Sequence, residues 1–104
     1  LMYTENLTPL VDKVVTVRSI NNDEFVGKLL SFSEDFIIIE HPRAVLINGP
    51  DVILSPFLLT AEADMVPMQL NNILCIVSTL PEAEKDYLES VKEETDAKES
   101  LEED

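Results

Sequence analysis

The stretch from Val14 to Glu40 constrains the fold most, because it holds two runs of strand-forming residues around a short polar turn. The first run, VVTVRSI, alternates apolar and polar residues, and both runs are rich in β-branched and aromatic side chains, as strands are. Gly27 lies inside the second run, where a glycine weakens a strand and marks a bend, a bulge or a close backbone approach. A strand bent at Gly27 curls a small sheet back on itself, so the sequence predicts a small barrel.

Charge divides the chain into a body and an acidic tail. The 104 residues carry a net charge of −14, and residues 81–104 hold eleven acids and three lysines, which is −8 of that total. A chain with a pI near 4.1 is a poor non-specific binder of phosphate backbones, because such affinity comes from many Lys and Arg side chains. The body is long enough to fold, but its core is small, and assembly into an oligomer would enlarge the buried area.

No residue pattern indicates a metal centre, a cofactor or a membrane span. Cys75 is the single cysteine, and its apolar neighbours predict a buried side chain with no disulfide or metal-ligand partner. His41 stands alone before Pro42, with no patterned carboxylate partner, so we interpret it as a surface residue rather than a base or a ligand. No stretch approaches the ~18 apolar residues of a membrane span, and no signal-peptide pattern is present, so a cytoplasmic protein is expected.

The predicted order of elements is a short helix, several strands and a final helix. Thr8 and Pro9 suit the start of the first helix. Strands are expected at residues 14–20, 24–32, 36–41, 45–54, 65–70 and 73–78. Pro42 is expected to end the third strand. Asn-Gly-Pro-Asp at residues 48–51 is expected to form a turn that interrupts the fourth strand. The final helix is expected over residues 81–94 with a thin apolar stripe, and the remainder is predicted to be disordered.

This order, with a glycine inside the second strand, resembles the Sm-like (LSm) family, whose small bent five-stranded barrels assemble into rings. The best match begins at Val15 and is similar to the family's first motif, a hydrophobic stretch with a bending glycine and a Leu two residues on. Residues 70–76 stand where the second motif, Ile-Arg-Gly or a relative followed by an apolar strand, is expected. The resemblance covers residues 8–78. It implies an Sm-like (SH3-like) barrel over residues 1–80, with an acidic C-terminal helix and tail over residues 81–104.

The residues through which the family binds RNA mostly differ in this chain. Ser33 stands at the family's Asp position, Ile37 at that of the Asn that hydrogen-bonds a base, and Asp35 at that of the residue that stacks on the base. Residues 71–72, both Asn, replace Arg-Gly. A register shifted by one residue puts Phe36 in the stacking position. The part of the pattern that carries the fold is therefore kept, while most of the RNA-contacting part is lost.

The resemblance places two loops together at the pore of a ring, and they supply most candidate nucleic-acid-binding residues. The candidates are Ser33, Glu34, Asp35, Phe36, Gln69, Asn71 and Asn72, with the basic residues Lys28 and Arg43. Phe36 either stacks on a base or, in the interpretation we favour, packs in the core. Asn71 and Asn72 either read base edges or only supply a turn with positive φ. Lys28 and Arg43 either line one face of the ring or are scattered solubilising charges.

The sequence therefore predicts a mainly β protein, and the resemblance implies that it forms a homo-oligomeric ring of about five to eight copies, a closed cyclic assembly. The first functional hypothesis is binding of RNA or single-stranded DNA in nucleic-acid processing. The alternative is a protein-interaction scaffold that no longer binds nucleic acid, which suits the net charge. An enzyme is not expected, because Ser31 and Ser33 have no general base and no Gly-x-Ser-x-Gly sequence is present. No cofactor and no membrane partner are expected.

Overall fold

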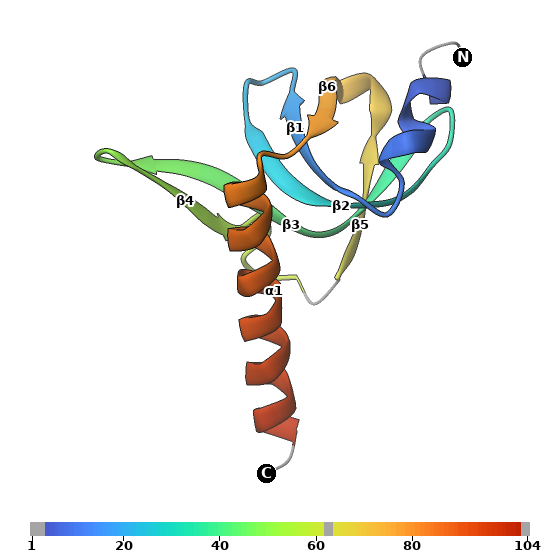
Figure 1. The fold of residues 1–104 in the computed structure, drawn as a ribbon. Helices are drawn as coiled ribbons and strands as arrows, with labels where there is room; N and C mark the ends of the chain where they lie inside the picture. Colours follow the sequence, from blue (N-terminus) through green and yellow to red (C-terminus); the bar gives the residue numbers. More distant parts are fainter. Residues whose placement is uncertain (1–3, 62–63, 103–104) are drawn as a thin grey trace.

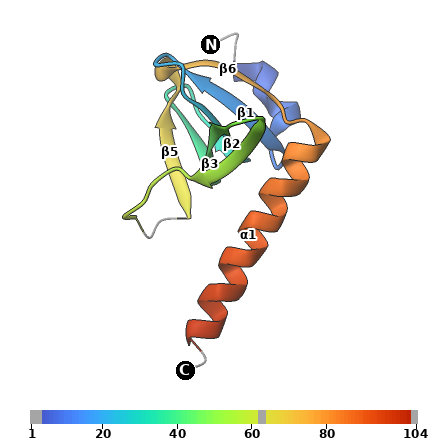
Figure 2. The same ribbon diagram turned by 90° about the vertical axis from the view of Figure 1, so that its left-hand side faces the viewer.

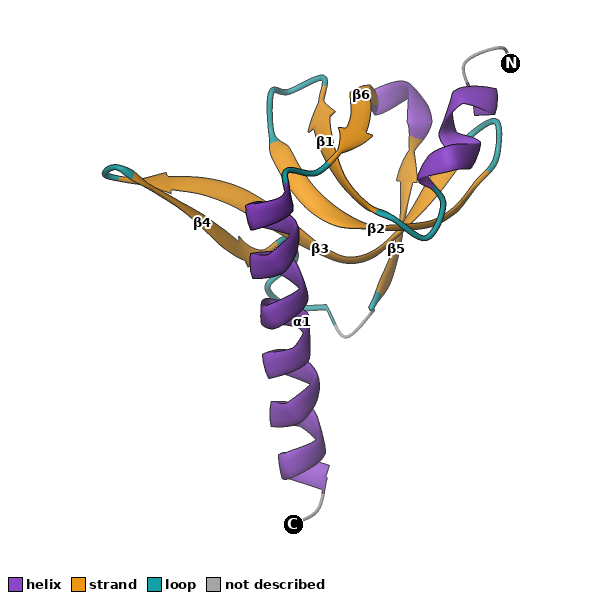
Figure 3. Cartoon of the chain, viewed as in Figure 1, coloured by secondary structure: helices purple, strands orange, loops and turns teal. Residues whose placement is uncertain are grey.

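A curved antiparallel sheet and one long C-terminal helix make up the computed structural model, which describes residues 4–61 and 64–102 (Figure 1 and Figure 3). The elements in chain order are the 3-10 helix η1 (Thr4–Leu10), β1 (Val14–Ser19), β2 (Glu24–Phe32), β3 (Phe36–Asn48), β4 (Asp51–Pro56), β5 (Met65–Gln69), the 3-10 helix η2 (Leu70–Asn72), β6 (Ile73–Ser78) and α1 (Pro81–Glu102). The mainly β class predicted from the sequence is confirmed.

Strand β3 is the longest and organises the sheet. One of its edges pairs with β2, while on the other edge residues 36–40 pair with β5 and residues 43–48 pair with β4. The strand order is β4–β3–β2–β1–β6, with β5 beside β3. The sheet has six strands where the resembled barrel has five, because β3 continues through Pro42 and forms a hairpin with the additional strand β4. Among the described strands β5 and β6 do not pair with each other, so the sheet is not closed.

A close approach of β2 and β3 explains the glycine at position 27. A Cβ atom there would lie 2.3 Å from Cγ2 of Ile39 and 3.2 Å from the carbonyl oxygen of Glu40. Val26 pairs with Arg43 and Lys28 with Glu40, so two residues of β3, at positions 41–42, face the single residue Gly27. Such a bulge bends the strands. The irregularity predicted at Gly27 is therefore confirmed, and β2 and β3 both curve in Figure 1.

The prediction that Pro42 ends the third strand is wrong. Pro42 lies in the bulge, where its missing N–H is not required by the hydrogen-bond ladder, and the strand runs on to Asn48. His41, beside it, adopts a positive φ of 48°. The two predicted turns are confirmed, since Asn22 (φ 67°) and Gly49 (φ 62°) have the left-handed backbone that these residue types tolerate.

Buried side chains form two clusters on opposite faces of the sheet. Alternation along β1 and β2 sends consecutive residues to opposite faces, so Val15 and Phe25 lie in one cluster and Val14 and Val26 in the other. The first cluster also contains Leu7, Val17, Leu29, Ile37 and Ile39. The second is completed by Tyr87 of α1, which is 2 % exposed. The sheet is therefore covered on one face by its own curvature and η1, and on the other by the start of α1.

The C-terminal segment differs from expectation. Residues 95–102 were expected to be disordered, but α1 continues to Glu102 and leads away from the sheet (Figure 2). The segment is rich in good helix formers, and Lys98 lies 3.6 Å from Glu94 one turn earlier and 3.2 Å from Asp64 across the chain. Such contacts favour the helical conformation. Residues 103–104 of the predicted tail, and 62–63 of the loop before β5, lie outside the described residues.

Two smaller differences concern the ends of the fold. Helix η1 begins at Thr4 and contains Pro9 internally, whereas a start at Thr8 was expected. Cys75 is exposed rather than buried, because β6 pairs with β1 alone among the described strands and lies at the edge of the sheet. Within the described part of the chain, no helix is both long enough and apolar enough to cross a membrane.

Candidate nucleic-acid interface

The structure brings the two candidate loops together. Phe36 pairs with Gln69 across β3 and β5. The backbone N–H of Leu70 donates to the carbonyl oxygen of Asp35 at 2.8 Å, which joins residues 33–36 directly to residues 69–72. The two segments are more than 30 positions apart in the chain, yet they form one continuous surface at the start of β3.

Ser33 shapes the first loop. Its hydroxyl oxygen accepts hydrogen bonds from the backbone N–H of Asp35 at 3.3 Å and of Phe36 at 3.2 Å, and its own N–H donates to the carbonyl oxygen of Phe36 at 2.8 Å. A serine that binds backbone groups in this way fixes a tight turn. This turn holds the backbone that carries Phe36.

The favoured prediction that Phe36 packs in the core is wrong. Its side chain is 42 % exposed, whereas Ile37 and Ile39 are fully buried. The four apolar residues from 36 to 39 are contiguous in sequence, but strand alternation sends only every second one inward. The inward positions are taken by Ile37 and Ile39, so Phe36 is left on the surface.

An open depression lies beside this aromatic ring. It is lined by Ser31, Phe32, Ser33, Phe36, Ile38 and Pro67. The lining is mainly apolar and includes two aromatic side chains, which are the groups on which unstacked bases pack in single-stranded nucleic-acid sites. The described surface around Phe36 can therefore accept a planar ring.

Side-chain amides stand on the second loop. Gln69, Asn71 and Asn72 are all exposed, and the Asn72 amide nitrogen donates to Oε1 of Gln69 at 3.1 Å. Neither Asn71 nor Asn72 is among the described residues with positive φ, so the alternative that they supply a left-handed turn is wrong. They lie in η2 instead, directly after Gln69 in the chain, and their exposed amides offer hydrogen-bond donors and acceptors.

The two basic candidates lie elsewhere. Lys28 lies in the middle of β2, where it pairs with Val14 and Glu40. It is five residues from Ser33, which corresponds to about 16 Å at the ~3.3 Å rise per strand residue. Arg43 is 5 % exposed; its Nε donates to Oγ of Ser90 at 3.0 Å and its guanidinium binds the Glu94 carboxylate. Arg43 therefore fastens α1 to β3 and does not contribute to the loop surface.

The loop surface is acidic. It includes Glu34 and Asp35, and neither residues 33–36 nor residues 69–72 include a Lys or Arg. A nucleic acid held at this surface of a single chain would be held through its bases, since phosphate contacts need positive side chains.

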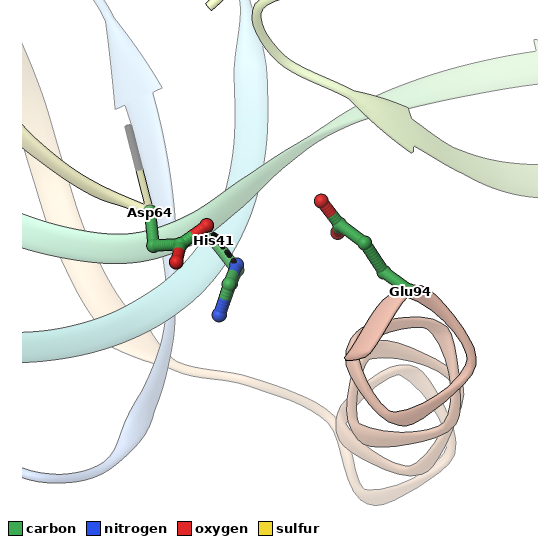
Figure 4. A group of neighbouring side chains, drawn as sticks. All are labelled: His41, Asp64 and Glu94. Atoms are coloured by element: carbon green, nitrogen blue, oxygen red, sulfur yellow. Dashed lines mark ion pairs between the residues drawn. The ribbon is translucent and has the colours of Figure 1, made fainter. Parts of the chain in front are cut away.

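A second polar cluster was missed in the sequence. His41, Asp64 and Glu94 approach one another from β3, the segment before β5, and α1 (Figure 4). The interpretation of His41 as a surface residue without carboxylate partners is wrong, because its side chain is 14 % exposed and Nδ1 lies 3.7 Å from Oδ1 of Asp64. The three residues are 23 and 30 positions apart, so no spacing in the sequence could signal their contact.

Comparison with protein-family models and with curated proteins finds no match to this chain.

Proposed function

We propose that the chain is a divergent Sm-like subunit that assembles with its own copies into a closed ring. Support comes from the strongly bent β2 and from free strand edges, since β5 pairs only with β3 and β6 only with β1 among the described strands. In the resembled family the strand in the place of β5 pairs with the strand in the place of β6 of the next subunit. Free edges offer unpaired backbone groups to another chain.

Exposed apolar side chains along these edges support the same proposal. Met65 of β5 is 59 % exposed, and Leu74 and Val77 of β6 are 60 % and 52 % exposed. The β3–β4 hairpin projects from the body (Figure 1) and exposes Ile47 at 83 % and Val52 at 65 %. Large apolar surface that one chain leaves exposed is typical of interaction sites.

We further propose that the ring binds single-stranded RNA or DNA through the loops at residues 33–36 and 69–72. The observation that carries this proposal is the exposed Phe36 ring, which lines an apolar depression and pairs across β3 and β5 with Gln69, whose side-chain amide binds that of Asn72. Stacking on an aromatic side chain contributes about 1–3 kcal/mol per base and tolerates any sequence. The amides supply base-edge hydrogen bonds.

The second candidate function is a protein-interaction scaffold that binds no nucleic acid. It is favoured by the acidic loop surface, by the burial of Arg43 and by the net charge of −14. The two functions differ in one measurable property, which is binding to short oligonucleotides at low salt.

Fluorescence anisotropy with labelled U-rich and A-rich single strands, at two salt concentrations, tests the proposal. The variant Phe36→Ala should weaken binding about tenfold or more, while Leu101→Ala, an exposed apolar change on α1, should not. We expect a shallow salt dependence, because the surface has few groups that contact phosphate. Equal affinity of the two variants would contradict a site at Phe36, and absence of binding by the unmodified protein would support the scaffold function.

A further inference from the structure

The cluster of His41, Asp64 and Glu94 has the composition of a metal site. One imidazole nitrogen and two carboxylate oxygens, one from each residue, all lie within 4.8 Å of one another. Donors about 2.1 Å from a tetrahedral metal ion are about 3.4 Å apart, so small side-chain rotations would bring this set to a common centre. An imidazole with two carboxylates suits zinc and other first-row divalent ions, whereas calcium and magnesium prefer oxygen donors alone.

The backbone places these donors firmly. The N–H of His41 donates to the carbonyl oxygen of Asp64 at 2.7 Å, which holds the two residues side by side. The β-bulge and positive φ at His41 set its backbone direction. Glu94 comes from α1, which Tyr87 anchors to the sheet one to two turns earlier. Figure 4 shows the side chains coming from three separate elements.

Space and charge at the cluster both suit a cation. A cavity of about 50 Å³ is lined by His41, Asp64 and Glu94 together with Arg43 and Lys98. One water molecule requires about 10–15 Å³, so the cavity has room for an ion and bound water. Arg43 binds Oε2 of Glu94, and Oε1 of the same carboxylate lies 3.6 Å from Nζ of Lys98, a cation that Asp64 also contacts.

A tethered cation already lies among the donors. The Nζ atom of Lys98 is 3.2 Å from Oδ1 of Asp64 and 3.6 Å from Oε1 of Glu94. The Lys98 side chain is 51 % exposed, so its ammonium group can swing into solvent without disturbing buried contacts. Arg43, in contrast, is buried and would stay on Glu94 as the group that orients this ligand.

We propose that His41, Asp64 and Glu94 form a binding site for a divalent transition-metal ion, such as Zn²⁺, and that the Lys98 ammonium occupies the site when no metal is bound. The ion would connect α1 to β3 and to the segment before β5. Metal binding would therefore strengthen the docking of the helix on the sheet, with Lys98 as the competing cation.

Isothermal titration of the full chain with ZnCl₂, after removal of metals with a chelator, tests the site. Cys75 is exposed and is replaced by Ser in every variant, so that its thiol cannot bind the metal. We expect one site per chain, and an affinity about tenfold higher in Lys98→Ala, in which the competing charge is gone. Loss of a ligand in His41→Asn or Glu94→Gln should lower the affinity at least tenfold. Asn is chosen at position 41 because it tolerates positive φ.

Glu93→Gln is the matched control, since it makes the same chemical change one residue away on an exposed position of α1. It should bind zinc with the affinity of the parent. Zinc should raise the melting temperature of the parent, Lys98→Ala and Glu93→Gln, but not that of His41→Asn or Glu94→Gln. Equal zinc affinity in His41→Asn and the parent would overturn the proposal. Absence of zinc binding by Lys98→Ala would also overturn it, because that variant retains all three ligands without the competitor.

Discussion

Gly27 is the residue on which the bend of the sheet depends. Any larger side chain must displace Cγ2 of Ile39, which is fully buried in the core and cannot move freely. We expect Gly27→Ala to lower the free energy of unfolding by about 1–3 kcal/mol through overpacking. Urea unfolding followed by circular dichroism measures the change. Gly49→Asn is the control and should have little effect on stability. A Cβ atom at position 49 would have no other group within 4 Å, and Asn tolerates the φ of +62° there.

Tyr87 completes the hydrogen bonding at the same bend. Its hydroxyl accepts the N–H of Lys28 at 3.2 Å and donates to the carbonyl oxygen of Glu40. Lys28 and Glu40 face each other next to the bulge, so the phenol bridges β2 and β3 where their register changes. Burial raises the pKa of Tyr87 to about 12, because the phenolate would lose its hydration.

Replacing Tyr87 by Phe should therefore cost about 1–3 kcal/mol of stability, since two backbone groups lose their partner. The raised pKa gives this cost a pH dependence. The contribution of the neutral phenol is complete below pH 10, the ordinary Tyr pKa, and is lost as pH rises through about 12. Urea unfolding of both proteins across this range should show their difference shrinking between pH 10 and 12. A difference that stays constant there would contradict the buried, hydrogen-bonded phenol.

The first half of α1 is anchored to the sheet, whereas its second half makes weaker contacts with the rest of the chain. Tyr87 and Arg43 fasten the first half, whereas in the described part of the helix beyond Glu94 the side chain of Lys98 forms half-exposed ion pairs. Such pairs contribute about 0–1 kcal/mol. Deleting residues 95–104 should therefore change the free energy of unfolding by less than about 1 kcal/mol. It removes five acids and one lysine, a net charge of −4, and should strengthen oligonucleotide binding at low salt.

A large loss of helix and sheet signal on that truncation, seen by circular dichroism, would contradict the division of α1 into two halves. Unchanged or weaker oligonucleotide binding would contradict the repulsion by the tail. A full-length chain with Asp96 and Glu99 replaced by Asn and Gln is the control, because it lowers the negative charge without shortening the helix.

Local patterns in the sequence predicted those elements whose geometry depends on neighbouring residues. The strand runs, the Asn22 and Gly49 turns and the irregularity at Gly27 follow from residue type and periodicity. The continuation of β3 through Pro42 does not follow from local patterns. It depends on pairing with β4 and β5 on either side of the bulge, and both of these strands lie further along the chain. The helical end of α1 was missed because charge and low hydrophobicity are shared by disordered tails and solvent-exposed helices.

The two candidate sites also differ in how far the sequence predicts them. Residues 33–36 and 69–72 were identified from a resemblance in the sequence, and the structure joins them by the pairing of Phe36 with Gln69. The exposure of Phe36 depends on which of four contiguous apolar residues face inward, which composition alone does not specify. Contacts among His41, Asp64 and Glu94 arise only from the tertiary fold, so they carry no local signal.

The whole chain leaves two of its described strand edges and several apolar side chains uncovered. The edges of β5 and β6 are free among the described strands, and the second core cluster is small. A chain of this length buries a limited share of its surface alone. Edge pairing between copies would satisfy the backbone groups of both strands and cover Leu74 and Val77.

Native mass spectrometry of the intact protein in neutral buffer tests whether the chain forms the proposed ring. We expect one closed species with a mass of about five to eight times the 11.7 kDa of the chain. The variant Leu74→Glu, which places a charge on the free edge of β6, should shift the species to monomer, while Leu101→Glu on α1 should not. A monomeric mass for the unmodified protein across micromolar concentrations would contradict the ring.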